Sequence, residues 1–551
     1  MHIMELFKKN HIQSNTRPMR LSRFYTLTLL ALTVLLGISA CKREQVFENP
    51  YAGGKSALGI QLSLLIPPSP QQGAPGTVVT FSATGLMAYK DQLTFLFNGT
   101  QAEVVSINDA SITVKVPVNS STGITTLVIG NQVLFGPRFK VLGKISVDPA
   151  FNVLNGANGA VNNAYQMSDG RYLLVGAFTD YDTKGIITPI RRITRSFKDG
   201  PDDLSFTSGG SDGPLNSIVV TSTNMFVAGS FGSFFFNNGK STLTNIYNIT
   251  RLNMNGAADS IQVPIINTNK KKGVPAFKGG TSGSITKLFN FQNRLIAIGG
   301  FRYYVKFRYD LLTGNKVPVD TILTPQVVGF NLDGSIDSTY RFDRSARKGP
   351  PGGNGSVTDG ALQPDGKLVM VGNFTKFDSI PAVRIVRLNT DGSIDQTFKS
   401  GAGADRAINS ISYNPATNKF LITGAFTTYD GQDAKGIAML NADGSLYTSF
   451  VSKGFTPQGL PTFARQLSNG LILVNGGFTT YNNVRRAGLM LLTPTGDLAP
   501  DYNCLGDFKG SIQDISESIN SSGKLTVLLM GNFKQIDGLA VNNISRIVLE
   551  P

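Results

Sequence analysis

The pattern of apolar and polar positions is clearest from Leu368 to Phe398. An apolar run at 368–371 ends at Gly372-Asn373-Phe374, a polar stretch follows, and a second apolar run at 385–388 leads to Asp391-Gly392. Short apolar runs bounded by turn residues are typical of β-strands, and Asp-Gly is a strong hairpin signal. The segment therefore predicts strand, loop, strand, tight turn and strand.

The Gly-x-Phe element occurs seven times, and successive glycines lie 53, 70, 73, 52, 52 and 55 residues apart. Periods in this range are typical of the blades of β-propellers. We expect an all-β chain in which residues 144–551 form a seven-bladed β-propeller. The structural repeat residues are Gly176, Phe178, Gly229, Phe231, Gly299, Phe301, Gly372, Phe374, Gly424, Phe426, Gly476, Phe478, Gly531 and Phe533.

The two ends of this region complement each other. The last copy stops at Arg546-Ile547-Val548-Leu549, before any Asp-x-x-Phe strand, and Asp148-Pro149-Ala150-Phe151 supplies that motif ahead of the first copy. An N-terminal strand that completes the last blade would remove an exposed sheet edge. We therefore predict a propeller closed by an N-terminal strand.

Two copies, at 372–398 and 424–450, keep Gly-x-Phe-Thr, Leu-Asn-x-Asp-Gly-Ser and a terminal Phe almost unaltered. They resemble the delta-sixty repeats of bacterial β-propellers. Copies one to three depart from that pattern, so the resemblance implies nothing about ligands there.

The segment from 62 to 143 alternates apolar and polar positions between Pro- and Gly-rich turns, as at Val78-Val79-Thr80-Phe81 and Ile112-Thr113-Val114. Period-two alternation predicts a small β-sandwich. The segment resembles the immunoglobulin-like IPT/TIG domains. That resemblance implies a spacer or an interaction module, and both alternatives stay open.

The N-terminus has the features of a bacterial lipoprotein signal. Arg17, Arg20 and Arg23 precede an uncharged run from Phe24 to Gly37, which suits a signal peptide and is short for a membrane span. The sequence Leu36–Cys41 resembles a lipobox. We expect residues 1–40 to be a signal peptide and 41–61 to be a lipidated Cys41 and tether, with outer-membrane localisation on the cell surface or the periplasmic face.

Composition excludes several catalytic classes. Both histidines, His2 and His11, lie within the predicted signal peptide, so the processed chain lacks a His base and any His-ligated metal. We expect no enzymatic activity, metal or cofactor, and a buried, unreactive Cys504. The acids that recur after Gly-x-Phe are expected to stabilise turns: Asp182, Asp378, Asp430 and Asp537. A carboxylate-based polysaccharide hydrolase or lyase, which could also use Tyr or Arg, stays open as the alternative.

The net charge of +15 falls to +11 once residues 1–40 are removed, and three enlarged loops next to the third copy contribute +4, +2 and +3. These predicted loops span 264–282, 302–325 and 341–356. Cations interleaved with aromatic residues favour an anionic glycan, a peptide or an acidic partner, although the aromatic residues could instead pack the loops down. The candidate binding residues are Lys270, Lys271, Lys272, Arg302, Tyr303, Tyr304, Lys306, Phe307, Arg308, Tyr309, Arg341, Arg344 and Arg347.

The combined arrangement is similar to accessory lipoproteins of Bacteroidetes-type bacteria that accompany SusC/SusD-like uptake systems. That resemblance implies glycan or peptide capture, or docking on the transporter complex. We expect a membrane contact through the lipid and no nucleic-acid partner, because nucleic acid does not fit an envelope compartment.

Overall fold

The computed structural model describes residues 58–184, 190–206, 208–236, 241–314, 316–455 and 459–551. The predicted signal peptide, Cys41 and nearly all of the tether lie outside these residues. The described chain is all-β, with two short 3-10 segments, η1 (Met87–Tyr89) and η3 (Tyr309–Leu311). Across the described ranges, no helix has the length and apolar character needed to cross a membrane.

Residues 61–141 form two sheets that pack face to face. Phe81 of the first sheet contacts Phe95 of the second, with ring centroids 4.8 Å apart. All four phenylalanines of this core, which also includes Phe97 and Phe139, are nearly inaccessible to solvent. The first sheet contains β1 (Gln61–Leu62), β3 (Val78–Thr84), β7 (Ser111–Lys115) and β6 (Glu103–Ile107); the second contains β2 (Gln72–Gly73), β9 (Gln132–Val141), β8 (Gly123–Ile129), β4 (Leu93–Phe97) and β5 (Thr100–Gln101).

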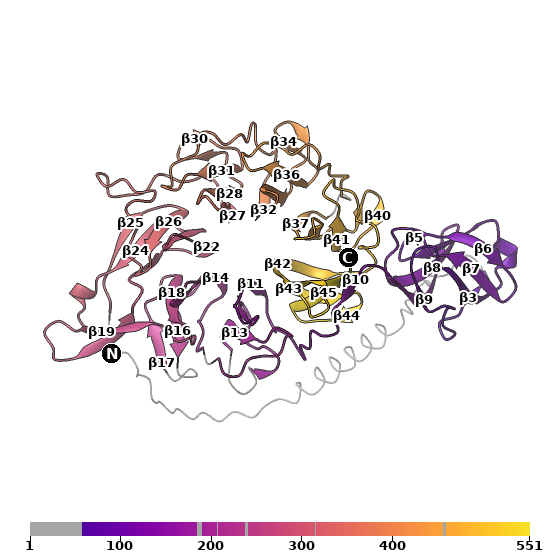
Figure 1. Cartoon of the computed structure of the whole chain (residues 1–551), viewed down its shortest axis with the longest axis horizontal. Helices are drawn as coiled ribbons and strands as arrows, with labels where there is room; N and C mark the ends of the chain where they lie inside the picture. Colours follow the sequence, from indigo (N-terminus) through magenta and orange to yellow (C-terminus); the bar gives the residue numbers. More distant parts are fainter. Residues whose placement is uncertain (1–57, 185–189, 207, 237–240, 315, 456–458) are drawn as a thin grey trace, which may run out of the picture. The chain divides into compact units, whose positions relative to one another are not determined.

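The rest of the chain contains seven described sheets built on one plan, here called the repeat sheets and numbered in chain order. In each, an inner strand pairs with a middle strand that contains the repeat glycine, and the middle strand pairs with an outer strand. Figure 1 shows them in succession around a common centre, with the inner strands nearest to it. The strands are β11 (Val161–Gln166), β12 (Tyr172–Gly176), β13 (Ile193–Ser196); β14 (Leu215–Val220), β15 (Asn224–Gly229), β18 (Ile249–Asn253); β22 (Ile285–Phe291), β23 (Arg294–Gly299), β26 (Val327–Asn331); β27 (Val357–Leu362), β28 (Leu368–Gly372), β31 (Ile385–Leu388); β32 (Ile408–Asn414), β33 (Lys419–Gly424), β36 (Ile437–Asn441); β37 (Pro461–Gln466), β38 (Ile472–Gly476), β41 (Leu489–Leu492); and β42 (Lys509–Ile519), β43 (Leu525–Ile536), β45 (Ile544–Leu549).

Short peripheral strands lie between the middle and outer strands or between successive repeat sheets, and they correct the sequence interpretation at the third repeat. Much of the predicted loops at 264–282 and 302–325 is strand, because Tyr303–Phe307 is a run of aromatic and β-branched residues that suits a sheet. The peripheral strands are β16 (Ser233–Phe236), β17 (Ser241–Thr244), β19 (Ser260–Pro264), β20 (Lys271–Pro275), β21 (Gly279–Thr281), β24 (Tyr303–Phe307), β25 (Val319–Leu323), β29 (Lys376–Phe377), β30 (Ile380–Pro381), β34 (Thr428–Tyr429), β35 (Gln432–Asp433), β39 (Thr480–Tyr481), β40 (Val484–Arg485) and β44 (Leu539–Ala540).

An N-terminal strand completes the seventh repeat sheet. β10 (Ile145–Val147) pairs antiparallel with β45, and Ile145 lies opposite Leu549. The sequence predicts this strand at Asp148–Phe151, whereas the strand that pairs with β45 lies just before it, at Ile145–Val147. Asp148 instead accepts a hydrogen bond of 2.6 Å from Arg546, whose guanidinium lies 5.0 Å from the centre of the Phe151 ring.

The Asp148–Arg546 contact is one copy of a recurring clasp. In the fourth repeat sheet, Arg387 donates to Asp395 at 2.9 Å and to the carbonyl of Ala442, in the turn of the next sheet, at 2.6 Å. Each clasp therefore joins an arginine, an aspartate on the same sheet and, in most copies, a neighbouring turn. The equivalent ion pairs are Arg195–Asp203, Arg251–Asp259, Arg294–Asp337 and Arg546–Asp148.

The repeat glycines lie where the middle strand presses against the inner strand. A Cβ atom built on Gly372 would lie 2.0 Å from the carbonyl oxygen of Ser356, and at the other six glycines it would lie 2.0–2.3 Å from the equivalent oxygen. The phenylalanine two residues later is buried in every copy, between 0% and 6% exposed. Gly-x-Phe therefore combines close backbone approach with a side chain in the core between sheets.

Gly299 and Gly300 provide a matched pair for testing this constraint. A Cβ on Gly299 would lie 2.3 Å from the Ser284 carbonyl oxygen, whereas one on Gly300 would have no atom within 4 Å. We expect Gly299→Ala to destabilise the protein by about 1–3 kcal/mol through overpacking. Thermal or urea unfolding of the purified variants measures the difference. Gly300→Ala should unfold like the original protein, and equal effects of the two substitutions would contradict the steric explanation.

Candidate functional site

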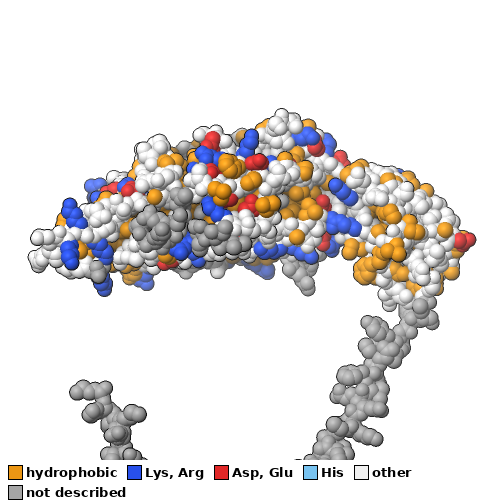
Figure 2. All heavy atoms as spheres, turned by 90° about the horizontal axis from the view of Figure 1, so that it is seen from below, with side chains coloured by type: hydrophobic (Ala, Val, Ile, Leu, Met, Phe, Trp, Pro, Cys, Tyr) orange, Lys and Arg blue, Asp and Glu red, His pale blue; other side chains and the backbone are white. Residues whose placement is uncertain are grey.

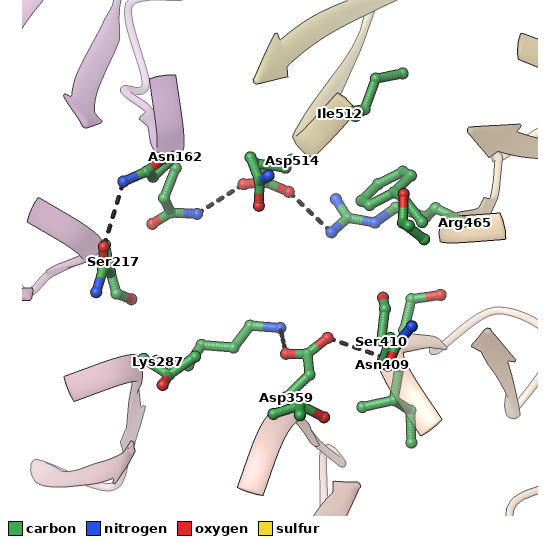
Figure 3. A pocket seen from close by; sticks show the side chains of 18 residues that line it. Asn162, Ser217, Lys287, Asp359, Asn409, Ser410, Arg465, Ile512 and Asp514 are labelled. Atoms are coloured by element: carbon green, nitrogen blue, oxygen red, sulfur yellow. Dashed lines mark hydrogen bonds and ion pairs between the residues drawn. The ribbon is translucent and has the colours of Figure 1, made fainter. Parts of the chain in front are cut away.

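A cavity of about 570 Å³ lies at the centre of the repeat sheets and is lined by their inner strands. Figure 3 shows its lining as a ring of amide, hydroxyl and charged side chains. Its volume is within the range usual for small-molecule sites. We call this space the central cavity.

A β-bulge in every inner strand directs side chains into the central cavity. In β27, Val357 lies opposite Gly372 and Asp359 opposite Val371, so Thr358 has no partner on the middle strand. The register shifts at the same place in the other six inner strands, each time just after the residue opposite the repeat glycine. Bulges of this kind re-aim side chains and are common beside functional sites.

Neutral residues at the bulges link one inner strand to the next. Asn162 donates to the carbonyl of Leu215 at 2.9 Å, Asn216 to that of Ile285 at 2.8 Å and Thr358 to that of Ile408 at 2.8 Å. These bonds, here called the polar belt, join three neighbouring pairs of inner strands and satisfy backbone carbonyl groups at the cavity wall.

Two ion pairs accompany this neutral belt in the cavity wall. Lys287 pairs with Asp359 at 2.8 Å, and Asp359 also accepts from the backbone amide of Ile411 at 2.9 Å. Arg465 pairs with Asp514 at 2.8 Å. In Figure 3 the two ion pairs lie on different parts of the wall, so the repeated scaffold has an asymmetric charge pattern at its centre.

Asp514 also links the last repeat sheet to the first. Its second carboxylate oxygen accepts from the Asn163 amide at 2.6 Å. Both cavity carboxylates are therefore held by a cation and by further hydrogen-bond donors.

Several polar groups in the cavity wall have no hydrogen bond to another described residue: the side chains of Thr286, Asn409 and Ser410. Hydroxyl and amide groups both donate and accept hydrogen bonds, so they suit recognition of a polar ligand. In the described ranges, no cluster of His, Cys, Asp and Glu is arranged to hold a metal ion.

Sequence reasoning missed the cavity residues because it sought broken symmetry in the loops. A signal was nevertheless present. When the inner strands are aligned on the residue that lies opposite each repeat glycine, such as Val357, the position two residues later changes from copy to copy: Asn163, Ser217, Lys287, Asp359, Ser410, Phe463 and Asp514.

The structure divides the predicted basic residues among different environments. Lys270 and Lys271 are exposed at the β19–β20 hairpin. Lys306, Arg344 and Arg347 line a separate hollow of about 380 Å³. Figure 2 shows Lys and Arg side chains gathered at the left-hand end, where Figure 1 labels β19, β24 and β25.

Most of the predicted aromatic residues pack within the fold. Phe307 is 5% exposed and stacks on Tyr309, with ring centroids 5.6 Å apart. Tyr304 is 1% exposed and donates to the carbonyl of Gly334 at 3.1 Å. Tyr303 is half-buried beside the exposed Arg302. Tyr304, Phe307 and Tyr309 therefore follow the alternative prediction, in which the aromatic residues pack the loops down on the fold.

Two of the predicted cations are engaged in ion pairs. Arg308 pairs with Asp310 at 2.7 Å and with Asp320 at 2.9 Å. Arg341 is 6% exposed, donates to Asp378 at 2.6 Å and lies 4.8 Å from the centre of the Phe377 ring. The placement of Arg341 in a ligand-binding loop is therefore incorrect, because its guanidinium lies inside the fold.

Arg341 makes a hydrogen bond that a tyrosine makes in other repeats, because this repeat has Phe377 in place of that tyrosine. In other repeats a tyrosine hydroxyl donates to a turn glycine carbonyl, as Tyr429 does to Gly444 at 2.9 Å. Phe377 has no hydroxyl, and Arg341 donates to the corresponding carbonyl of Gly392 at 3.3 Å.

The recurring acids stabilise turns, as the sequence predicts. Asp182, Asp378, Asp430 and Asp537 all have φ between 47° and 53°. Asp378 accepts from the amide of Gly352 at 2.8 Å, and the other three make the equivalent bond. Cys504 is a buried free thiol, and burial raises its pKa to about 11.

Two family models match parts of the chain. Residues 38–137 match a domain of unknown function, DUF5008, and residues 363–398 and 416–450 match DUF5122, described as a β-propeller domain of unknown function. The second match covers the two repeats that are most regular in sequence. The IPT/TIG assignment of the first domain stays a prediction. No curated protein sequence matches the chain.

Solved structures similar to this chain include propellers at low identity. The WD40 β-propeller domain of Doa1 is 13% identical, with 74% of this chain and 98% of that chain covered and a TM-score of 0.40. The computationally designed Ika8 protein is 12% identical, with 72% and 98% covered and a TM-score of 0.35. A structural genomics protein of unknown function from Bacteroides thetaiotaomicron is 11% identical, with 89% and 98% covered and a TM-score of 0.22.

The buried position of Arg341 can be tested against the exposed Arg344. We expect Arg341→Met to lower the free energy of unfolding by about 3 kcal/mol, because it leaves Asp378 without its buried partner. Arg344→Met, which removes the same charge from an exposed site, should change stability by no more than about 0.5 kcal/mol. Chemical denaturation measures both values. Equal stabilities would contradict a structural role for Arg341.

Proposed function

We propose that this protein is a non-enzymatic, lipid-anchored envelope protein whose propeller binds a polar ligand, a glycan or a peptide segment, in the central cavity. The observation that supports this proposal is the asymmetric polar wall of the cavity. One bulged strand from each repeat sheet contributes to that wall, so the ligand would contact the whole ring.

Seven repeat sheets of one plan, completed by β10, support a seven-bladed propeller closed by an N-terminal strand. The two packed sheets at 61–141 support an immunoglobulin-like spacer before it. β9 ends at Val141 and β10 begins at Ile145, next to the boundary that the sequence places between 143 and 144. A propeller of this kind is suited to binding or to a scaffold role.

Binding rather than hydrolysis is favoured by the state of the cavity acids. Asp359 and Asp514 each have a cationic partner within 3 Å and accept further hydrogen bonds. Carboxylates that cleave a glycosidic bond must contact the glycosidic oxygen and the reacting carbon or water. Here both oxygens of each carboxylate already accept a bond from the protein.

Adding a bulky side chain to the cavity wall should weaken ligand binding. Ser410 lines the wall without a side-chain hydrogen bond to another described residue, so Ser410→Phe adds bulk while leaving the polar belt intact. Screening the purified protein by calorimetry and affinity gels against neutral polysaccharides and peptides identifies a ligand. We expect the affinity of Ser410→Phe for that ligand to fall at least about tenfold, the equivalent of 1.4 kcal/mol.

Ser222→Phe is the matched control, because Ser222 is exposed in the turn between β14 and β15. It should bind as the original protein does. Undiminished binding by Ser410→Phe would place the ligand elsewhere. Release of new reducing ends from a polysaccharide would reject the non-enzymatic assignment in favour of a hydrolase or lyase.

Membrane attachment is proposed to depend on Cys41, which lies outside the described residues. Acylation would add about 0.8 kcal/mol of membrane affinity per buried methylene. We expect Cys41→Ala to move the protein from the membrane fraction to the soluble fraction, as measured by immunoblotting after fractionation. The same substitution at Cys504 is the control and should leave the protein with the membrane. Retention of Cys41→Ala in the membrane would contradict lipid anchoring.

We further propose that the anchored protein assists a SusC/SusD-like outer-membrane transporter. The similarity of the domain order to accessory lipoproteins of such systems supports this partner, and the surface or periplasmic orientation would follow from it. Co-purification of a transporter with this protein from solubilised membranes is the corresponding test.

A further inference from the structure

The third repeat sheet has a second concave site, separate from the central cavity. Its walls come from β24 and β25, from the turn that follows β26 and from the segment at 341–349. We call it the basic hollow. Lys306, Arg344 and Arg347 are its charged residues, and no acid lines it.

The acids around the basic hollow are already paired with other groups. Asp310 and Asp320 both pair with Arg308, at 2.7 and 2.9 Å. Asp333 pairs with Lys278 at 3.5 Å, and Asp337 with Arg294 at 2.5 Å. The salt bridges among described residues include none to Lys306, Arg344 or Arg347. The hollow therefore keeps a net positive potential.

The segment that presents the two arginines is held in place at both ends. Arg341 is anchored by its buried pair with Asp378, and the amide of Gly349 donates to the carbonyl of Leu323 in β25 at 2.7 Å. The backbone that carries Arg344 and Arg347 is thus held at both ends, which lowers the entropic cost of ordering this segment on binding.

Asp343 shapes the turn between these anchors. Its carboxylate accepts from the amides of Ser345 and Ala346, at 2.8 and 3.0 Å. The bond from Ala346 is the main reason why the pKa of Asp343 is lowered. This acid faces its own turn amides, and the charges of Arg344 and Arg347 remain available to a ligand.

The remaining walls of the hollow are apolar and suit flat rings. Phe342, Ile322 and Ile336 are half-buried, and the ring of Tyr304 closes the inner side. Aromatic and aliphatic surfaces bind the apolar faces of sugar rings, while cations at the rim bind their acidic substituents. β24 is paired on both sides, with β21 and with β25, so the strand that carries Lys306 offers no free edge to an extended peptide.

We propose that the basic hollow binds an acidic oligosaccharide, with sugar rings against Phe342 and carboxylate or sulfate groups on Lys306, Arg344 and Arg347. This site goes beyond the proposed function of the central cavity, because it uses other residues and another ligand chemistry.

The test measures binding of a heparin-derived hexasaccharide and of an oligogalacturonate to the purified protein by calorimetry. The triple variant Lys306→Gln, Arg344→Gln, Arg347→Gln should bind about tenfold more weakly, since three exposed ion pairs together amount to that factor. The affinity of the original protein should fall steeply as NaCl is raised. Phe342→Ala should weaken binding of the hexasaccharide without altering this salt dependence.

The matched control is Lys140→Gln, Lys198→Gln, Lys509→Gln, which removes three exposed charges outside the hollow. It should bind as the original protein does. An equal loss of affinity in both triple variants would show that net charge alone determines binding, and it would overturn the proposed site. Equal or tighter binding of hexaglutamate, or binding of neither acidic oligosaccharide, would also overturn the proposal. Thermal unfolding of each variant verifies that the fold is retained.

Discussion

The close approach of each repeat glycine to the carbonyl of the inner strand is the constraint on which the rest of the structure depends. With no Cβ at Gly372, the carbonyl of Ser356 can approach the middle strand directly. The inner strand then bulges two residues later, at Thr358. Because the same steps recur in all seven sheets, one steric requirement both packs the sheets and directs side chains into the central cavity.

The fold could be predicted from the sequence because its determinants are local. Gly-x-Phe and Asp-Gly specify close approach, a buried ring and a turn within a few residues, and the structure confirms these roles. The candidate site could not be predicted in the same way. Asp359 and Asp514 become cavity residues only through a bulge and through partners on other strands, and Arg341 is buried because Phe377 lacks a hydroxyl. The positions of these three side chains depend on which residues lie opposite one another in the folded sheets, and local sequence does not specify that.

Arginine clasps connect several of the repeat sheets to the turn of a neighbouring sheet. Arg387 and Arg546 each join an aspartate, an aromatic ring and a carbonyl of a neighbouring turn. In the third repeat, Gly329 occupies the usual arginine position, and Arg294 of the middle strand takes over the clasp to Asp337 and the carbonyl of Thr390. The third repeat sheet therefore keeps its bond to the next sheet, although the arginine comes from the middle strand and not from the outer strand. Its peripheral strands can then differ from those of the other repeats without loss of that bond.

The pairing of β10 with β45 has a consequence for the order of folding. Asp148 and Arg546 are 398 residues apart in sequence, yet they form the same clasp that other sheets make between near neighbours. We expect a contact this distant to form late, because the loop that it closes costs more entropy than the loops closed within one sheet. The other repeat sheets can assemble from adjacent segments, whereas the seventh needs both ends of the region. We therefore expect the pairing of β10 with β45 to be the last step of assembly, and until then β45 has an open edge that can pair with another chain.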